Sequence, residues 1–357
     1  MEGAGKRIVL SIDGGGMRGL IPLRILESLE SRLAQRGLAR PLHRVFDLMA
    51  GTSTGGLIAA GLAAPRPSGG RSEAAATVAE LRALFETEAR EIFQPRLRTR
   101  LVRLIGNPLR PADERLDARP FERHLKERFG WTSMASSLTR LLLTAYDIGN
   151  RRPLFLGAGQ PDGSPADDYY LWQAVRATTA VPAFFEPARV ENLSQKREEA
   201  LIDGGVFLND PTLAAYGEAR RLGWAAEDLV IVSLGTGFAP SRGFAFEDAV
   251  QWDGGAWMRA SRGAPLQAIA THAQSAAGSL LAGRLFSDLG GVTYHRFDGE
   301  IPAEAEDMGN ARPGNMLVLN GAADRILRDN TLRLDALADL IVAVHARRTP
   351  AGLERAA

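Results

Sequence analysis

The chain has 357 residues, of which 45% are hydrophobic and 24% charged, and its formal net charge is +1. This composition is ordinary for a globular protein and argues against a disordered or membrane-spanning chain. A net charge near zero gives no global attraction to nucleic acid, so neither DNA nor RNA is expected as a partner. The absence of cysteine excludes disulfides, thiolate nucleophiles and cysteine-ligated zinc.

The N-terminal part alternates apolar strands with amphipathic helices. The pattern predicts a strand at 7–12, a helix at 20–36, a strand at 44–50 and a helix at 54–63. Alternation of this kind is typical of a parallel sheet with helices packed on its faces. The apolar run before Asp13 is too short for a signal peptide, and no stretch reaches the ~18 apolar residues of a membrane helix. We therefore expect a cytoplasmic protein, with peripheral contact to the inner membrane surface left open.

Residues 64–135 interrupt this alternation and are interpreted as an insertion or cap, with helices at about 73–93 and 119–129. Downstream, strands are predicted at 139–148, 153–158, 199–204, 228–235 and 291–297, and helices at 170–178, 212–222, 265–285 and 321–346. No linker separates two domains. We expect one catalytic domain over 1–357, with a core at about 7–240 and a helical C-terminal extension at about 260–347.

A candidate nucleophile lies in the sequence Gly51-Thr52-Ser53-Thr54-Gly55, between a predicted strand and a predicted helix. This G-x-S-x-G pattern in a strand-to-helix turn is typical of a nucleophile elbow, in which glycines allow close backbone approach. The helix N-terminus would favour an attacking oxygen and the anion it creates. The alternative is an ordinary glycine-rich turn in which Ser53 caps the helix.

The glycines of "DGGGMRG", which begins at Asp13, have the G-x-G-x-x-G spacing of a dinucleotide site. Such a site usually has an acidic residue at the end of the second strand, but here that strand leads into Ser53. The other interpretation is an oxyanion hole, in which N–H groups of the turn at 14–17 bind the oxygen that becomes negative during acyl transfer. Arg18 could add charge or brace the turn. Neighbouring strands would place the two glycine loops side by side.

These motifs, followed by Asp203-Gly204-Gly205, resemble those of the patatin-like phospholipase family of lipid acyl hydrolases. The likeness runs from about residue 7 to 240 and includes "LWQAVRATTAVPAFFEP" and "IVSLGTG". The resemblance implies a three-layer α/β/α fold with a mainly parallel central sheet and a helical cap. It also implies an oxyanion hole in the segment formed by Gly14, Gly15, Gly16, Met17, Arg18 and Gly19.

A serine nucleophile needs a base within hydrogen-bond reach. The sequence allows a triad of Ser53, Asp203 and either His272 or His295, or a dyad of Ser53 and Asp203 alone. The resemblance favours the dyad. Asp253 also precedes two glycines, but no strand leads into it, so a turn is expected there.

The expected function is hydrolysis of fatty-acyl esters in membrane phospholipids, without a cofactor or metal. The stretch 94–111 carries Arg96, Arg98, Arg100, Arg103 and Arg110 among leucines, and is interpreted either as a membrane-binding segment or as a solvated cap face. The resemblance is also compatible with an anionic or cyclic-nucleotide activator and with a bacterial membrane-degrading effector. Two alternatives stay open, namely a non-catalytic lipid-binding or storage protein of the same fold and a Rossmann-type oxidoreductase.

Overall fold

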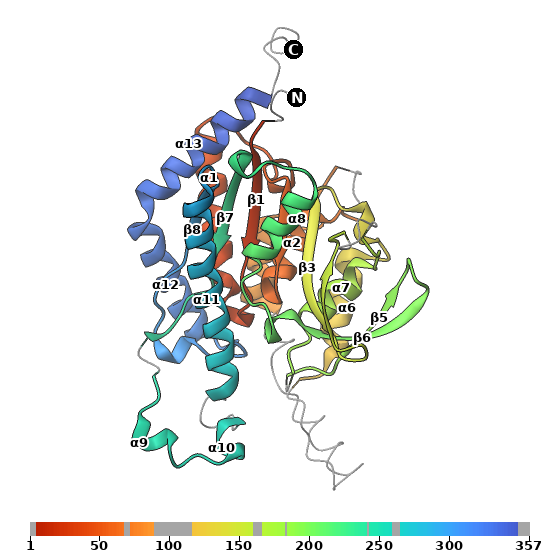
Figure 1. Cartoon of the computed structure of the whole chain (residues 1–357), viewed down its shortest axis with the longest axis vertical. Coiled ribbons are helices and arrows are strands. Elements are labelled where there is room, and N and C mark those ends of the chain that lie inside the picture. The colour runs from red at the N-terminus through yellow and green to blue at the C-terminus, as the bar shows by residue number, and fades with distance from the viewer. Residues whose placement is uncertain are drawn as a thin grey trace.

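The computed structural model describes residues 5–67, 72–88, 116–159, 166–182, 184–240, 243–258 and 265–348. A single sheet crosses the middle of the molecule, with helices on both sides (Figure 1). Its strands are β1 (Arg7–Ile12), β2 (Leu48–Gly51), β3 (Arg140–Asp147), β4 (Arg152–Leu156), β5 (Ala188–Asn192), β6 (Arg197–Asp203), β7 (Leu229–Leu234) and β8 (Thr293–Phe297).

The strand order is β5-β6-β3-β2-β1-β7-β8, with β4 paired to β3. The centre of the sheet is parallel, because β1 pairs in parallel with both β2 and β7, β2 with β3, and β7 with β8. The edge built from β4, β5 and β6 is antiparallel. The expected three-layer α/β/α fold with a mainly parallel central sheet is therefore confirmed.

The helices in the described residues are α1 (Leu20–Gln35), α2 (Thr54–Ala63), α3 (Val78–Ala83), α6 (Ala118–Phe129), α7 (Leu171–Thr178), α8 (Thr212–Arg221), α9 (Phe246–Ala249), α10 (Gly254–Met258), α11 (Pro265–Leu289), α12 (Pro313–Asp329) and α13 (Thr331–Arg348). Short α9 and α10 lie away from the sheet, at the lower end of the molecule (Figure 1). The larger apolar core lies under α1, α2, α7, α12 and α13, and a smaller one under α8 and α11. Alternate residues of β1 serve the two cores: Ile8, Leu10 and Ile12 face the first, and Val9 the second. This is the period of two expected of a strand buried on both faces.

Some predicted elements were wrong in extent. The strand predicted at 44–50 begins only at Leu48, after a 3-10 turn at Leu42–Arg44. The helix predicted at 73–93 begins at Val78, where Thr77 caps it, and becomes a π-helical turn at Leu84–Glu88. The helix predicted at 321–346 is two helices that meet at Asn330. Short β5, α9 and α10 were not predicted, because their apolar patterns are too brief to recognise.

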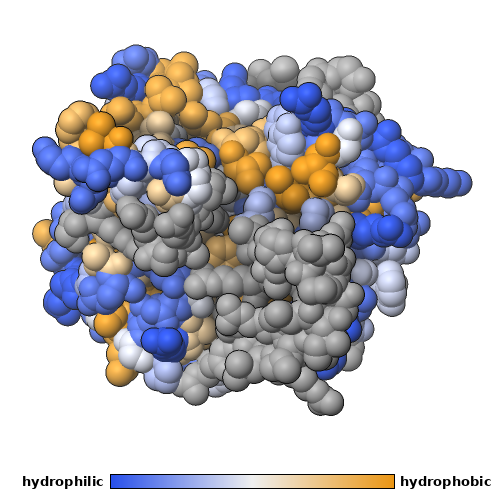
Figure 2. All heavy atoms as spheres, turned by 90° about the horizontal axis from the view of Figure 1, so that it is seen from below, coloured by the Kyte–Doolittle hydropathy of each residue, from blue (hydrophilic) through white to orange (hydrophobic). Residues whose placement is uncertain are grey.

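None of the helices within the described ranges is both long and apolar enough to cross a membrane. Apolar side chains nevertheless reach the surface seen from below, where they lie among hydrophilic ones (Figure 2). On α9, at the lower end of Figure 1, Phe246 is 75% exposed, and the next residue after the helix, Val250, is 63% exposed.

Candidate functional site

Ser53 lies in a sharp turn between β2 and α2, with φ 55° and ψ −125°. A positive φ is strained for a residue with a side chain and is typical of nucleophile elbows. The flanking glycines are required by close backbone contacts: a Cβ on Gly51 would lie 2.3 Å from the carbonyl oxygen of Gly55, and a Cβ on Gly55 would lie 2.2 Å from that of Ile12. The G-x-S-x-G pattern is therefore a steric requirement of this turn.

Buried threonines hold the elbow in place. The backbone N–H of Ser53 donates to the hydroxyl of Thr178 at 2.9 Å. The hydroxyl of Thr52 donates to the carbonyl of Leu208 at 2.9 Å and accepts from the hydroxyl of Thr144 at 2.8 Å. These bonds tie the elbow to α7, to β3 and to the loop after β6, so its strained conformation is supported from three sides.

Asp203 ends β6, and the register along β3 explains why it comes close to Ser53. Gly51 pairs with Leu143, and Asp203 pairs with Ala145, two residues further along β3. The carboxylate of Asp203 is 2% exposed. Its Oδ1 accepts the N–H of Gly205 at 2.7 Å, while its Oδ2 is buried without a conventional partner among the described residues.

Burial raises the pKa of Asp203 to about 7, and interactions with the Ser53 side chain and with the N–H of Gly205 work in the opposite direction. A carboxyl group with a pKa near neutrality can accept a proton and release it again under physiological conditions.

The glycine turn after β1 lies against Ser53, as expected from the pairing of β1 with β2. A Cβ on Gly14 would lie 3.1 Å from the Cβ of Ser53. Two of the N–H groups at 14–17 are already bonded within the protein: that of Gly14 donates to the carbonyl of Asn209 at 3.1 Å, and that of Met17 to the carbonyl of Met308 at 2.9 Å.

The remaining N–H groups of the turn, those of Gly15 and Gly16, have no hydrogen bond within the described parts of the chain. The same holds for the N–H of Thr54, the first residue of α2. Thr54 was not expected from the sequence as a donor, although the residue after the nucleophile often supplies an oxyanion donor. Within the 14–17 turn, the unbonded N–H groups are therefore those of Gly15 and Gly16, and Thr54 has another close by.

Arg18 braces the turn from behind. Its Nε donates to the carbonyl of Gly15 at 3.3 Å and its Nη1 to that of Gly237 at 3.0 Å. Burial lowers the pKa of Arg18, whereas the charges of Glu306, Asp298 and Asp13 raise it. At the end of the turn, Gly19 packs against α2, since a Cβ there would lie 2.7 Å from the hydroxyl of Thr54.

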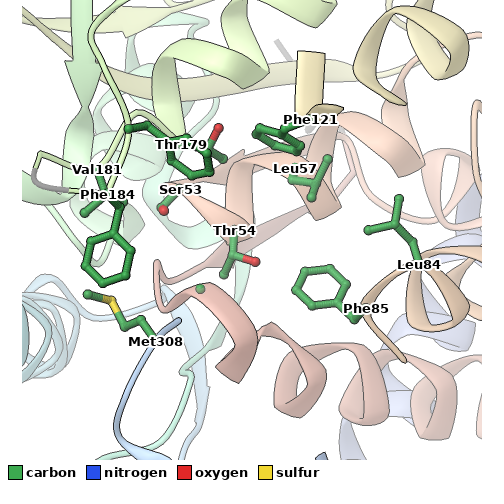
Figure 3. Close-up of a pocket in the computed structure, with 12 residues that line it drawn as sticks. Ser53, Thr54, Leu57, Leu84, Phe85, Phe121, Thr179, Val181, Phe184 and Met308 are labelled. Carbon is green, nitrogen blue, oxygen red and sulfur yellow. The ribbon is translucent and has the colours of Figure 1, made fainter. Parts of the chain in front are cut away.

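An apolar pocket opens beside Ser53 (Figure 3). The cavity itself is small, with a volume of about 40 Å³. Beside Gly16, Ser53 and Thr54, its lining is formed by Leu57, Leu84, Phe85, Phe121, Thr179, Val181, Phe184, Phe185 and Met308. The Ser53 hydroxyl points toward the ring of Phe184, and the rings of Phe121 and Phe85 lie farther along the pocket (Figure 3). A hydrocarbon chain would be the complementary ligand for such walls.

The two histidines considered for a triad each contact an aromatic ring. His272, on α11, faces the ring of Phe238 at 6.1 Å, and His295, on β8, stacks on Phe297 at 6.3 Å. Within the described residues, no hydrogen bond joins either of them to Ser53 or Asp203. Burial lowers the pKa of His295. Asp253 directly precedes α10 rather than lying in the expected turn, and its carboxylate accepts the N–H of Ala256 at 2.6 Å, as a helix cap does.

Several site residues were not singled out from the sequence. Thr178 and Thr179 lie within "ATTAVPAFF", and Asn209 follows Asp203 by six residues, so proximity to the motifs was an available signal. Met308 comes from the C-terminal extension, and nothing local in its sequence marks it. The arginine-rich stretch 94–111 lies outside the described residues.

Comparison with known proteins agrees with these motifs. The family model for patatin-like phospholipases matches residues 10–216. Patatin-like protein 2 of Oryza sativa subsp. indica is 30% identical, over 92% of this chain and 85% of its own length. A protein of Solanum tuberosum named "probable inactive patatin-3-Kuras 1" is 26% identical, over 90% of this chain and 86% of its own length. Among solved structures, VipD of Legionella pneumophila is 15% identical and aligns with a TM-score of 0.36, over 90% of this chain and 67% of that one. On the family match and the relative from rice, the chain belongs to the patatin-like phospholipase family.

Proposed function

We propose that the protein is a serine lipid acyl hydrolase that cleaves fatty-acyl esters of glycerophospholipids with Ser53 and Asp203. The observation that carries the proposal is a strained serine that lines an apolar pocket, on the strand pair next to a buried carboxylate whose pKa is raised to about 7. Family membership supports lipid hydrolysis in general. The assignment to these two residues is our own.

In the first step, the Ser53 oxygen attacks the acyl carbonyl and its proton passes to Asp203. The carbonyl oxygen becomes an oxyanion, for which the N–H groups of Gly15, Gly16 and Thr54 are the unbonded donors at hand. The tetrahedral intermediate then collapses. The ester C–O bond breaks, and the leaving lysolipid alkoxide takes the proton from Asp203, so that the acyl group remains on Ser53.

In the second step, Asp203 accepts a proton from a water molecule that attacks the acyl-Ser53 ester. Collapse of this intermediate releases the fatty acid and returns the proton from Asp203 to Ser53. Asp203 thus alternates between base and acid in both steps, a role that suits a pKa near the working pH. The apolar pocket would hold the acyl chain, so that its carbonyl lies at Ser53.

A membrane surface is the proposed source of the substrate. The exposed apolar residues at α9, Phe246 and Val250, support contact with lipid. The arginines at 98, 100 and 103 remain a sequence-based proposal for the same role. Changing these three arginines to glutamate should reduce activity on anionic vesicles and spare a soluble ester. Equal losses on both substrates would contradict the interfacial role.

The competing proposal is a non-catalytic lipid-binding protein. It is considered because the relative from Solanum tuberosum is named as probably inactive. Wild type, Ser53→Ala and Asp203→Ala should be incubated with mixed phospholipid vesicles, and free fatty acid and lysolipid measured. We expect the wild type to release both products and Ser53→Ala and Asp203→Ala to release neither. His272→Ala and His295→Ala are the controls and should stay active. Full activity of Ser53→Ala would refute the serine mechanism, and binding of lipid without release by the wild type would favour the competing proposal.

A further inference from the structure

A buried arginine on β8, Arg296, forms a bidentate ion pair with Asp13, the residue before the glycine turn. The Nη1 and Nη2 atoms of Arg296 each donate to one oxygen of Asp13, both at 2.7 Å. Nη2 also donates to Asp298 at 2.8 Å, and Nη1 to the hydroxyl of Ser233 at 2.9 Å. The side chains of Arg296 and Asp13 are only 13% and 1% exposed. A two-pronged contact of this kind fixes both distance and orientation.

The same guanidinium faces the loop that follows Asp203. Its Nη1 lies 3.6 Å from Oδ2 of Asp210, a carboxylate oxygen that has no hydrogen bond within the described residues. The other oxygen of Asp210 accepts the N–H of Thr212 at 2.9 Å. Asp210 directly follows Asn209, so Arg296 lies between the two segments that carry the site.

Asn209 and Gly14 then join these segments to each other. The N–H of Gly14 donates to the carbonyl of Asn209 at 3.1 Å, and the side-chain amide of Asn209 donates back to the carbonyl of Gly14 at 3.2 Å. Asp13 directly precedes Gly14 in the chain, and Asp210 directly follows Asn209. A shift of either carboxylate would therefore move the turn at Gly15 and Gly16 relative to Ser53.

The surrounding carboxylates explain why a cation is needed at this position. Burial raises the pKa of Asp13 to about 7, the charge of Arg296 lowers it, and Asp210 and Asp298 raise it again. Burial alone would lower the pKa of Arg296, but the three carboxylates hold it well above its ordinary value. Loss of the guanidinium would leave buried carboxylates facing one another without a cation, which is strongly unfavourable.

We propose that Arg296 is a positioning residue for acyl transfer, which acts through Asp13 and Asp210 to hold the oxyanion turn in register with the loop after Asp203. Arg296 itself touches neither substrate nor the reacting atoms. The inference rests on the proposed function, because the turn must bind an oxyanion for its position to affect the rate. A lysine cannot reproduce the planar fork that spans Asp13 and Asp210.

The test compares Arg296→Lys and Arg296→Gln with the wild type in hydrolysis of a soluble p-nitrophenyl ester, well below the unfolding temperature of each variant. We expect kcat to fall on the order of 10-fold in the lysine variant and on the order of 100-fold in the glutamine variant, with little change in KM, because displaced catalytic groups slow the chemical step. Arg348→Gln is the control: it breaks another arginine–carboxylate pair, to Asp47 at 2.6 Å, at a distant position before β2. It should lower stability and leave kcat unchanged.

Retention of wild-type kcat by Arg296→Lys or by a folded Arg296→Gln, with only the unfolding temperature lowered, would overturn the inference. Adding Asp13→Asn to Arg296→Gln should not lower kcat any further. Additive losses in the double variant would overturn the claim that Arg296 acts through Asp13. Reaction of Ser53 with a fluorophosphonate separates this inference from the function: if the wild type releases no fatty acid but is labelled, slower labelling of the Arg296 variants upholds the inference. A wild type that is neither active nor labelled would overturn both.

Discussion

The N–H of Met17 donates to the carbonyl of Met308 at 2.9 Å, so a segment near the C-terminus closes over the glycine turn near the N-terminus. The side chain of Met308 also lines the apolar pocket with Ser53 and Phe184 (Figure 3). Part of the pocket wall therefore comes from a region beyond residues 10–216, which the family model matches.

Met308 should influence which acyl chains are accepted. In Met308→Ala, the pocket gains space beside Ser53, so we expect the ratio of kcat/KM for long over short p-nitrophenyl esters to change by roughly 10-fold in favour of the long chain. Leu317→Ala, at a 75% exposed position on α12, is the matched control and should leave the ratio unchanged. An unchanged ratio in Met308→Ala would remove Met308 from the acyl site.

As the pH rises, activity should increase while the contribution of Asp203 to stability decreases. Asp203 acts as a base only when ionised, and its pKa is raised to about 7, so kcat/KM for a soluble ester should rise with pH and level off above about 7. The folded pKa lies above the ordinary value of 3.8, so the folded state holds this proton more tightly. The stabilising contribution of the group is therefore full below pH 3.8 and is lost as the pH rises toward 7.

The control for this prediction is Asp203→Asn, which cannot titrate. Between pH 5 and pH 8, the unfolding temperature of the wild type should fall relative to that of Asp203→Asn. Asp13 also has a raised pKa, but it is present in both proteins and cancels in the comparison. A difference that stays constant over this range would show that Asp203 has an ordinary pKa.

The hydroxyl of Thr178 should matter for rate. Thr178→Val keeps the shape of the side chain but removes the acceptor for the Ser53 N–H, 2.9 Å away, so a buried donor loses its partner. We expect kcat to fall by roughly 10-fold, since an unpaired buried donor costs about 1–3 kcal/mol and the elbow would shift to satisfy it. Thr139→Val removes a comparable bond, to the carbonyl of Phe46 at 2.8 Å, and should leave kcat unchanged. Equal rates in both variants would deny Thr178 a role at the elbow.

Two glycine substitutions should have opposite effects on stability. Gly55→Ala places a Cβ 2.2 Å from the backbone oxygen of Ile12 and should cost at least about 2 kcal/mol of unfolding free energy, because backbone atoms must move. Gly217→Ala, at an exposed position of α8 with open space around it, should stabilise by about 0.5–1 kcal/mol through helix propensity. Urea unfolding measures both. Equal stabilities of Gly55→Ala and the wild type would show that the elbow is looser than described.

The juxtaposition of the glycine turn and Ser53 was predictable, because both follow neighbouring parallel strands and their glycines mark tight turns. The sequence also placed Asp203 within a predicted strand, at 199–204, and in the structure this residue ends β6. Its register against Ala145 was not predictable, since β6 runs antiparallel to β3 and pairing between distant strands leaves no local pattern. Arg296 and Met308 were missed for the same reason: their roles depend on contacts with residues near the N-terminus.

Modification of the nucleophile tests the central claim most directly. The protein should be incubated with a long-chain alkyl fluorophosphonate, digested, and the modified residue located by mass spectrometry. We predict one adduct, on Ser53, with none in Ser53→Ala and slower formation in Asp203→Asn. An unmodified Ser53 peptide, or equal modification of Ser53→Ala, would contradict the proposed mechanism.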